Sequence, residues 1–193
     1  MKKPILYLTV VLLLAGCATG SKLPVEIYDF GIPAAVAPPP GQDVFVADIR
    51  AAEWLGTTEM LYRLEYRNPR NLAPYAASRW AAPPAHMLTM RLRQSVGNAT
   101  SARGKQAKCS LALFISEFSQ VFANEQDSRA VMHIRASLTD TATTERAQVR
   151  EFRVEKKAPT PNAAGAAGAF SEIAASVAEE LNAWITETGI CKS

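Results

Sequence analysis

The fold is decided by two segments, CSLALFIS (109–116) and RAVMHIRASL (129–138). In both, large apolar residues alternate with polar or small ones, which is the pattern of a strand with one buried face. Residues 146–156 continue the alternation with more charged side chains, as an edge strand would. Polar segments at 124–128 and 140–144 lie between the three and predict turns. Together these segments predict an antiparallel three-stranded meander.

Three further strands are predicted upstream of the meander. Segments 25–30 and 60–66 alternate apolar with polar residues, and segment 44–49 is dense in residues that favour strands. A run of prolines at 38–40 predicts a stiff surface loop between the first two strands. Turn-forming residues after the third strand predict an irregular connection over 68–75.

Two helices complete the predicted fold. Pro83 and Pro84 suit a first helical turn, and the partly amphipathic sequence after them predicts a helix to about Val96. A second, alanine-rich helix is predicted after residues 159–162. Its apolar stripe consists of Phe170, Ile173, Ala174, Val177, Leu181, Trp184 and Ile185. The elements predict an α/β protein of the α+β kind: a single domain whose mixed, largely antiparallel sheet packs against two main helices.

The N-terminus has the anatomy of an export signal. Lys2 and Lys3 precede the apolar run 5–14, which is too short to cross a bilayer that needs about 20 helical residues. The residues that follow, Leu14-Ala15-Gly16-Cys17, resemble a bacterial lipobox, in which cleavage exposes Cys17 for acylation. The alternative is an ordinary signal peptide with an incidental cysteine. We favour the lipobox, because the cysteine lies where the small-residue cleavage site belongs.

This interpretation divides the chain into a signal peptide (1–16), a lipidated tether (17–22) and a folded domain (23–193). Acyl chains on Cys17, palmitate among them, would anchor the protein stably to a bilayer. The tether keeps the domain within about 20 Å of the anchor, at roughly 3.3 Å per residue. Ala18 after the cysteine resembles bacterial sorting patterns for the outer membrane. The predicted location is therefore the outer membrane of the cell envelope, on its periplasmic side.

The charge balance argues against a nucleic-acid partner. The 193 residues carry 21 Lys and Arg against 18 Asp and Glu, a net charge of +3. Two of the surplus charges are Lys2 and Lys3, which leave with the signal peptide. The remaining arginines are scattered, so no basic field is expected. The sequence leaves open whether the chain associates with itself.

Two cysteines remain in the mature chain, Cys109 and Cys191. Export places them in an oxidising compartment, where paired cysteines usually form disulfides. A bridge between them would close a loop of roughly eighty residues, worth about 4 kcal/mol on the chain-entropy argument. The alternative is two unrelated thiols.

Motifs of known enzyme chemistry are missing from the sequence. The two histidines, His86 and His133, have no partner pattern, and there is no metal-ligand spacing, phosphate-binding loop or nucleophile motif. We therefore expect neither catalytic residues nor a cofactor or metal, and predict that the protein is not an enzyme.

Several short motifs behind the lipobox occur in a recognisable order. They are Tyr28-Asp29-Phe30-Gly31, Glu53-Trp54-Leu55, Met60-Leu61-Tyr62-Arg63, Tyr75, Arg79-Trp80-Ala81-Ala82-Pro83-Pro84 with the helix after it, Glu117-Phe118-Ser119-Gln120-Val121-Phe122, and Ala183-Trp184. In this order the sequence resembles the ABC-type transport auxiliary lipoproteins, the PqiC/YmbA-like family. The cysteine pair is not part of the resemblance.

The resemblance implies a non-enzymatic lipoprotein that acts as an auxiliary or docking component of an ABC transporter. Its implied partner is a periplasmic protein of the mammalian-cell-entry type, and the implied process is lipid transport between membranes. Tyr75, Arg79 and Trp80 are candidates for the partner surface, because aromatic and arginine residues concentrate in interface cores. The alternative for Trp80 is a core residue at the helix entrance.

Two other functions stay open at this point. One is a periplasmic carrier that binds a lipid or small ligand in its own pocket. The other is a structural lipoprotein of the envelope that serves no transporter.

Overall fold

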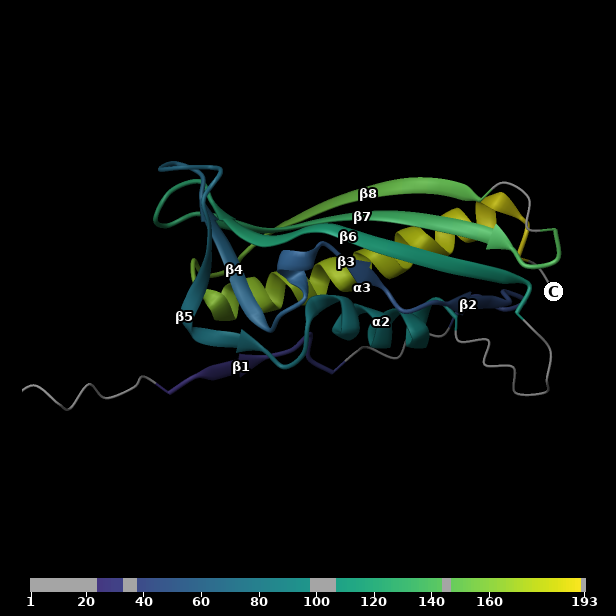
Figure 1. Cartoon of the computed structure of the whole chain (residues 1–193), viewed down its shortest axis with the longest axis horizontal. Coiled ribbons are helices and arrows are strands. Elements are labelled where there is room, and N and C mark those ends of the chain that lie inside the picture. The colour runs from purple at the N-terminus through teal and green to yellow at the C-terminus, as the bar shows by residue number, and fades with distance from the viewer. Residues whose placement is uncertain (1–23, 33–37, 98–106, 144–146, 192–193) are drawn as a thin grey trace, which may run out of the picture.

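The computed structural model describes residues 24–32, 38–97, 107–143 and 147–191 of the chain (Figure 1). The predicted signal peptide and tether, with Cys17, lie outside these ranges. The described residues form one mixed sheet of eight strands, and two α-helices lie on the same face of this sheet. The predicted α+β architecture is confirmed.

The strands and the helices are each numbered in their order along the chain. The strands are β1 (Glu26–Tyr28), β2 (Val44–Val46), β3 (Arg50–Ala51), β4 (Glu59–Leu64), β5 (Leu72–Trp80), β6 (Cys109–Phe122), β7 (Ser128–Asp140) and β8 (Gln148–Lys157). The helices are α2 (Pro84–Ser95) and α3 (Ala163–Thr188), and a 3-10 turn, η2 (Glu53–Leu55), follows β3.

Strand β6 is the centre of the sheet. On one side it pairs antiparallel with β7, and β7 pairs antiparallel with β8, so the predicted meander is confirmed. On its other side three short strands, β2, β3 and β4, lie one after another, and all three run parallel to β6. Beyond β4 come β5, which is antiparallel to it, and β1, which is parallel to β5.

Strand β5 corrects the prediction of an irregular connection over residues 68–75. The turn is confined to the residues before Leu72, and the chain then runs as a nine-residue strand to Trp80. Proline is found in strands chiefly at edges, and Pro74 lies where β5 has only β4 beside it, because β1 pairs with residues 78–80. Because Pro74 interrupts the alternation of apolar and polar residues, the sequence of β5 does not show the regular pattern of a strand.

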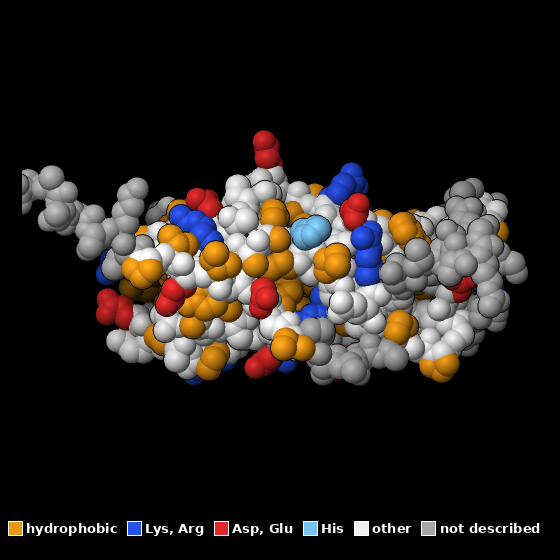
Figure 2. Space-filling model, turned by 90° about the horizontal axis from the view of Figure 1, so that it is seen from below, with side chains coloured by type: hydrophobic (Ala, Val, Ile, Leu, Met, Phe, Trp, Pro, Cys, Tyr) orange, Lys and Arg blue, Asp and Glu red, His pale blue; other side chains and the backbone are white. Residues whose placement is uncertain are grey.

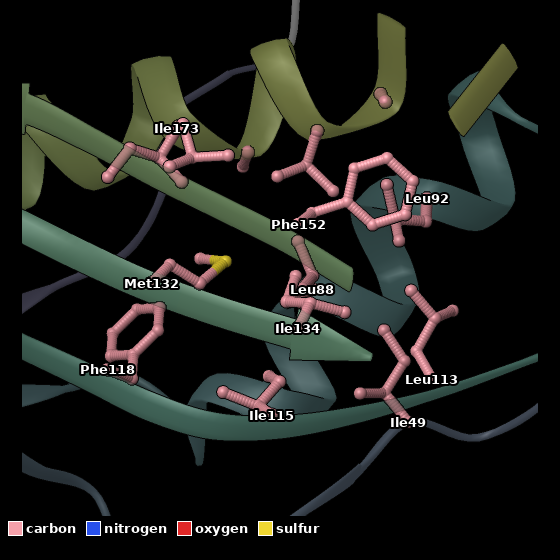
Figure 3. Close-up of a cluster of buried hydrophobic side chains, with 14 of the residues drawn as sticks. Ile49, Leu88, Leu92, Leu113, Ile115, Phe118, Met132, Ile134, Phe152 and Ile173 are labelled. Carbon is pink, nitrogen blue, oxygen red and sulfur yellow. The ribbon is translucent and has the colours of Figure 1, made fainter. Parts of the chain in front are cut away.

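A bulge in β6 changes which side chains face the helices. The register with β7 shifts between Ile115 and Glu117, so that Ser116 is an extra residue. Before the bulge, Leu113 and Ile115 face the helices and are buried; after it, Phe118 does so. Figure 3 shows these side chains packed between the strands and the helices.

The two helices close the core from one side. α2 begins at Pro84, where a missing N–H costs no helical hydrogen bond. α3 begins after Asn162, whose side chain accepts a hydrogen bond from the N–H of Gly165 at 2.9 Å. The predicted stripe of α3 is buried against the sheet, from Phe170 to Ile185. Trp184 there lies edge-on to Phe152 of β8.

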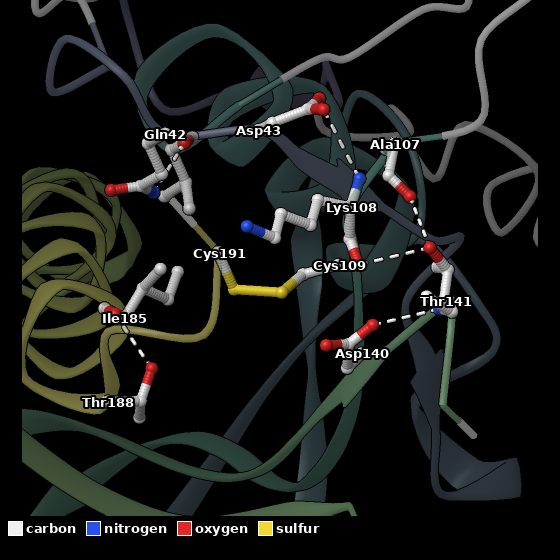
Figure 4. The surroundings of a disulfide bond; sticks show 12 residues. Gln42, Asp43, Ala107, Lys108, Cys109, Asp140, Thr141, Ile185, Thr188 and Cys191 are labelled. Atoms are coloured by element: carbon white, nitrogen blue, oxygen red, sulfur yellow. Dashed lines mark hydrogen bonds between the residues drawn. A yellow bond between two sulfur atoms is a disulfide. The ribbon is translucent and has the colours of Figure 1, made fainter. Parts of the chain in front are cut away.

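A disulfide joins the end of α3 to the start of β6. The sulfur atoms of Cys109 and Cys191 are bonded, and their Cα atoms are 5.5 Å apart (Figure 4). The loop that leads to β2 fastens the same corner: the N–H of Asp43 donates to the carbonyl of Cys191, and the carbonyl of Asp43 accepts from the N–H of Cys109, both at 3.1 Å.

Candidate functional site

The three residues predicted as a partner surface do not share one surface. Trp80 is only 3% exposed and packs edge-on against Phe30, Phe118 and Phe170. It is a core residue, so the prediction that it contacts a partner is wrong and the alternative is correct. The sequence could not separate the two roles, because the strand that carries Trp80 into the core was not predicted.

Tyr75 and Arg79 are half-buried and held by contacts within the domain. The hydroxyl of Tyr75 donates to Oε1 of Gln120 at 2.6 Å, and its ring lies 4.9 Å from that of Tyr62. Burial raises the pKa of Tyr75 above its ordinary value. The guanidinium of Arg79 donates to the carbonyls of Tyr75 and Ser78. A role of Tyr75 and Arg79 in partner binding stays a prediction.

The face of the sheet opposite α2 and α3, which we call the outer face, carries a different group of residues. Phe114 of β6 is 38% exposed there. Its register neighbours are Arg50 of β3 on one side and Arg135 of β7 on the other, and Arg135 is followed by Glu151 of β8. A half-exposed aromatic ring thus lies in a row between two exposed arginines.

Around this row the outer face is open. Phe45 and Val149 are also exposed large hydrophobic residues of this face. By register Val149 lies two residues from the row, and Phe45, opposite Ser110, lies four residues from it. Beside the row is a shallow depression of about 160 Å³, lined in part by Ser116, His133 and Arg153. We call this region, from Phe45 to Arg153, the open half of the outer face.

The other half of the outer face is closed by ion pairs between strands. Arg63 of β4 pairs with Glu117 at 2.9 Å, and Arg129 of β7 pairs with both Glu65, at 3.2 Å, and Glu155, at 2.8 Å. The hydrogen bond to Glu65 raises the pKa of Arg129 above its ordinary value. Side chains on the same half are buried: Leu61, Ser119, Val121 and Val131.

Sequence reasoning missed the open half, although one signal for it was present. In CSLALFIS the positions that alternate with the buried ones are Ser110, Ala112, Phe114 and Ser116. Phe114 is the single large apolar residue in that exposed series. A large apolar residue on the exposed side of an otherwise regular strand indicates an interaction surface when other exposed apolar residues lie near it.

A second apolar surface lies near the start of the described chain, and we call it the β1–α2 face. Its exposed hydrophobic residues are Val25 just before β1, Ile27 of β1, Ile32 after β1, and Met90 of α2. A depression of about 230 Å³ lies between the two elements, lined in part by Asp29, Met90 and Arg91. Burial lowers the pKa of Arg91 from its ordinary value.

Among the described residues, no group of three His, Cys, Asp or Glu side chains is placed to hold a metal ion. His86 and His133 lie on different surfaces, at α2 and on β7. The helices found in the described ranges also include none that is long and apolar enough to cross a membrane.

Comparisons with known proteins identify both the domain and the N-terminus. The profile of a family described as ABC-type transport auxiliary lipoprotein component matches residues 28–182. A prokaryotic membrane lipoprotein lipid attachment site matches residues 1–18, which include Cys17. No curated protein matches the chain.

Solved structures share the fold. A crystal structure of a Xanthomonas campestris protein is 23% identical, with a TM-score of 0.68, over 85% of this chain and 96% of that one. A crystal structure of an uncharacterised protein is 14% identical, with a TM-score of 0.57, over 82% of this chain and 99% of that one. The α+β arrangement therefore occurs in proteins of quite different sequence.

Proposed function

Because this chain belongs to the family of ABC-type transport auxiliary lipoproteins, we propose that it is the docking component of an ABC transport system at the outer membrane. In this role it catalyses no reaction. It holds a periplasmic protein of the mammalian-cell-entry type, which carries lipid between the two membranes. The lipid attachment site makes it a membrane-anchored lipoprotein of the cell envelope. Ala18 after Cys17 supports the outer membrane as its location.

The observation that carries the docking role is the exposed row around Phe114. Phenylalanine and arginine are enriched in the centres of protein interfaces, where a few such residues supply most of the binding energy. Here Phe114 has an arginine on each side in the register. The long antiparallel pairing of β6 with β7 and β8 makes the row a rigid platform, so little ordering is required on binding.

The carrier alternative requires space inside the domain for a ligand. In the described part of the chain, the layer between sheet and helices is filled by buried side chains, as Figure 3 shows around Met132 and Phe152. This packing supports a docking role over a carrier. Native mass spectrometry of the delipidated protein with added phospholipid separates the two, because only a carrier would retain one lipid per chain.

Alanine substitution of Phe114 tests the docking role. The acylated protein in detergent is titrated with the soluble part of the transporter's mammalian-cell-entry-type protein, and the affinity is measured. We expect Phe114→Ala to weaken binding by about tenfold, the scale of a central interface residue.

Tyr66→Ala is the matched control for this substitution. Tyr66 is 41% exposed, similar to Phe114, but it lies at the end of β4 outside the open half. Its replacement should leave the affinity unchanged. Equal affinities for Phe114→Ala and the unchanged protein would contradict the assignment of the docking surface. No binding by the unchanged protein would contradict the docking role itself.

A further inference from the structure

The lipid anchor and the β1–α2 face are close together along the chain. The lipid attachment site ends at residue 18, and Ile27 of β1 follows Cys17 by ten residues. Ten residues span at most about 35 Å when fully extended. Helix α3, with 26 residues, is itself about 39 Å long. Because this reach is shorter than α3, the connection keeps β1 within about 35 Å of the anchor and favours the side that bears β1 for contact with the bilayer.

Hydrogen bonds fix the segment that follows β1 to both helices. Arg91 of α2 donates hydrogen bonds to the carbonyls of Phe30, at 2.6 Å, and Gly31, at 3.2 Å. Ser171 of α3 donates to the same carbonyl of Phe30 at 2.6 Å. The ring of Phe30 is buried against Trp80 and Phe118. Ile32, next in the chain, is thereby held in place at the surface.

This fixed surface exposes the largest apolar fractions on the described part of the molecule. Ile32 is 98% exposed and Ile27 is 70% exposed, and about half of Val25 and of Met90 is exposed as well. Figure 2, which views the molecule from this side, shows hydrophobic side chains gathered over the region of β1 and α2. The charges nearby include both signs, because Asp29 and Arg91 line the same depression.

The side chains of Val25 and Ile27 lie on the same side of the domain as the depression beside α2. In β1 alternate residues face opposite ways, and Tyr28 packs against the core. Val25 and Ile27 therefore face away from the core, and Asp29, which continues the same alternation, lines the depression together with Met90. Val25, Ile27 and Met90 thus belong to one side of the domain, and Gly31, the neighbour of Ile32, lines the same depression.

We propose that the β1–α2 face rests on the lipid bilayer that holds the anchor, with Ile27, Ile32 and Met90 at the level of the lipid headgroups. The short connection favours this side for contact with the membrane, and exposed apolar side chains enter the interface region of a bilayer favourably. Because the local charges are mixed, the contact does not depend on anionic lipid. This placement goes beyond docking and orients it: the open half of the outer face then points away from the membrane.

Depth-sensitive fluorescence tests the orientation. The acylated protein is placed in phosphatidylethanolamine–phosphatidylglycerol vesicles with a bimane probe on Ile27→Cys, Ile32→Cys or Met90→Cys. Matched controls carry the probe on Phe114→Cys or Val149→Cys, which are exposed apolar positions of the outer face. Quenching is compared between a lipid-borne nitroxide and aqueous iodide. Unchanged thermal melting confirms that each labelled protein is folded.

We expect the lipid-borne quencher to act at least about threefold more strongly on the β1–α2 probes than on the controls, as contact within the headgroup region requires. Iodide should give the reverse order. The same preference is expected in vesicles without phosphatidylglycerol. Equal quenching of all five probes, or stronger lipid quenching at Phe114→Cys, would overturn the proposal.

A second copy of the chain is the other occupant that the experiment distinguishes. If it covered the β1–α2 face, the Ile27→Cys protein would cross-link to itself in detergent without vesicles, and its probe would be shielded there too. That result would overturn contact with the bilayer. Because the test uses only lipoprotein and vesicles, its outcome is independent of partner binding, which is measured by the Phe114→Ala titration.

Discussion

Two phenylalanines on strand β6, Phe114 and Phe118, occupy opposite environments. Phe118 is 2% exposed, stacks on Phe170 of α3 with ring centroids 3.8 Å apart, and lies edge-on to Trp80. Phe114 is 38% exposed and lies between arginines on the outer face. In a regular strand, residues four apart share a face. The extra residue Ser116 places them on opposite faces, so one bulge separates a core ring from an exposed ring on the same strand.

The first test of this comparison replaces the inner ring. Phe118→Ala removes a fully packed ring and leaves a cavity between β6 and α3, so we expect the free energy of unfolding to fall by about 3–5 kcal/mol. Urea denaturation of the purified protein measures this. Phe114→Ala is the matched control from the same strand, with an expected loss within about 1 kcal/mol. Similar losses for the two would show that the bulge does not separate their roles.

The disulfide stabilises the same inner layer. Replacing both Cys109 and Cys191 by Ser removes a cross-link over 82 residues, and we expect a loss of about 2–4 kcal/mol in the free energy of unfolding. On gels, the unchanged protein should migrate faster without reductant, whereas the double variant should not shift. Two freely alkylated thiols in the unfolded, unreduced protein would refute the bridge.

The ion pairs on the closed half of the outer face should contribute least. Arg129 bridges Glu65 and Glu155, but all three side chains are about one-third to one-half exposed. Exposed pairs are worth about 0–1 kcal/mol and are screened by salt. We therefore expect Arg129→Met to cost at most about 1 kcal/mol, and less in high salt. A loss as large as that of Phe118→Ala would show that this half is part of the core.

The sequence predicted those elements in which a simple period survives. Strands β7 and β8 alternate regularly, β6 does so up to its bulge, and α3 has an unbroken apolar stripe, so all four were foreseen. Strand β5 was not predicted, because Pro74 and the turn before it interrupt the alternation that would have marked it as a strand. For the same reason Trp80 was a candidate for the partner surface, with a core position left open as the alternative.

The bulge was also hidden, because a single inserted residue leaves no mark in the composition of a strand. Phe114 could have been noticed as the one large apolar residue among small polar ones. No sequence pattern could predict the neighbours of Phe114, because they come from β3 and β7 and are brought together only by the fold.

The parallel pairing of β2, β3 and β4 along one side of β6 affects the order in which the domain can form. A chain exported from its N-terminus delivers these strands before the strand that they pair with. Of the three, only β4 has a partner, β5, that emerges before β6. Residues 109–191, by contrast, contain β6, β7, β8, α3 and both halves of the disulfide. The last part of the chain to be delivered is therefore the template on which the first part completes its sheet.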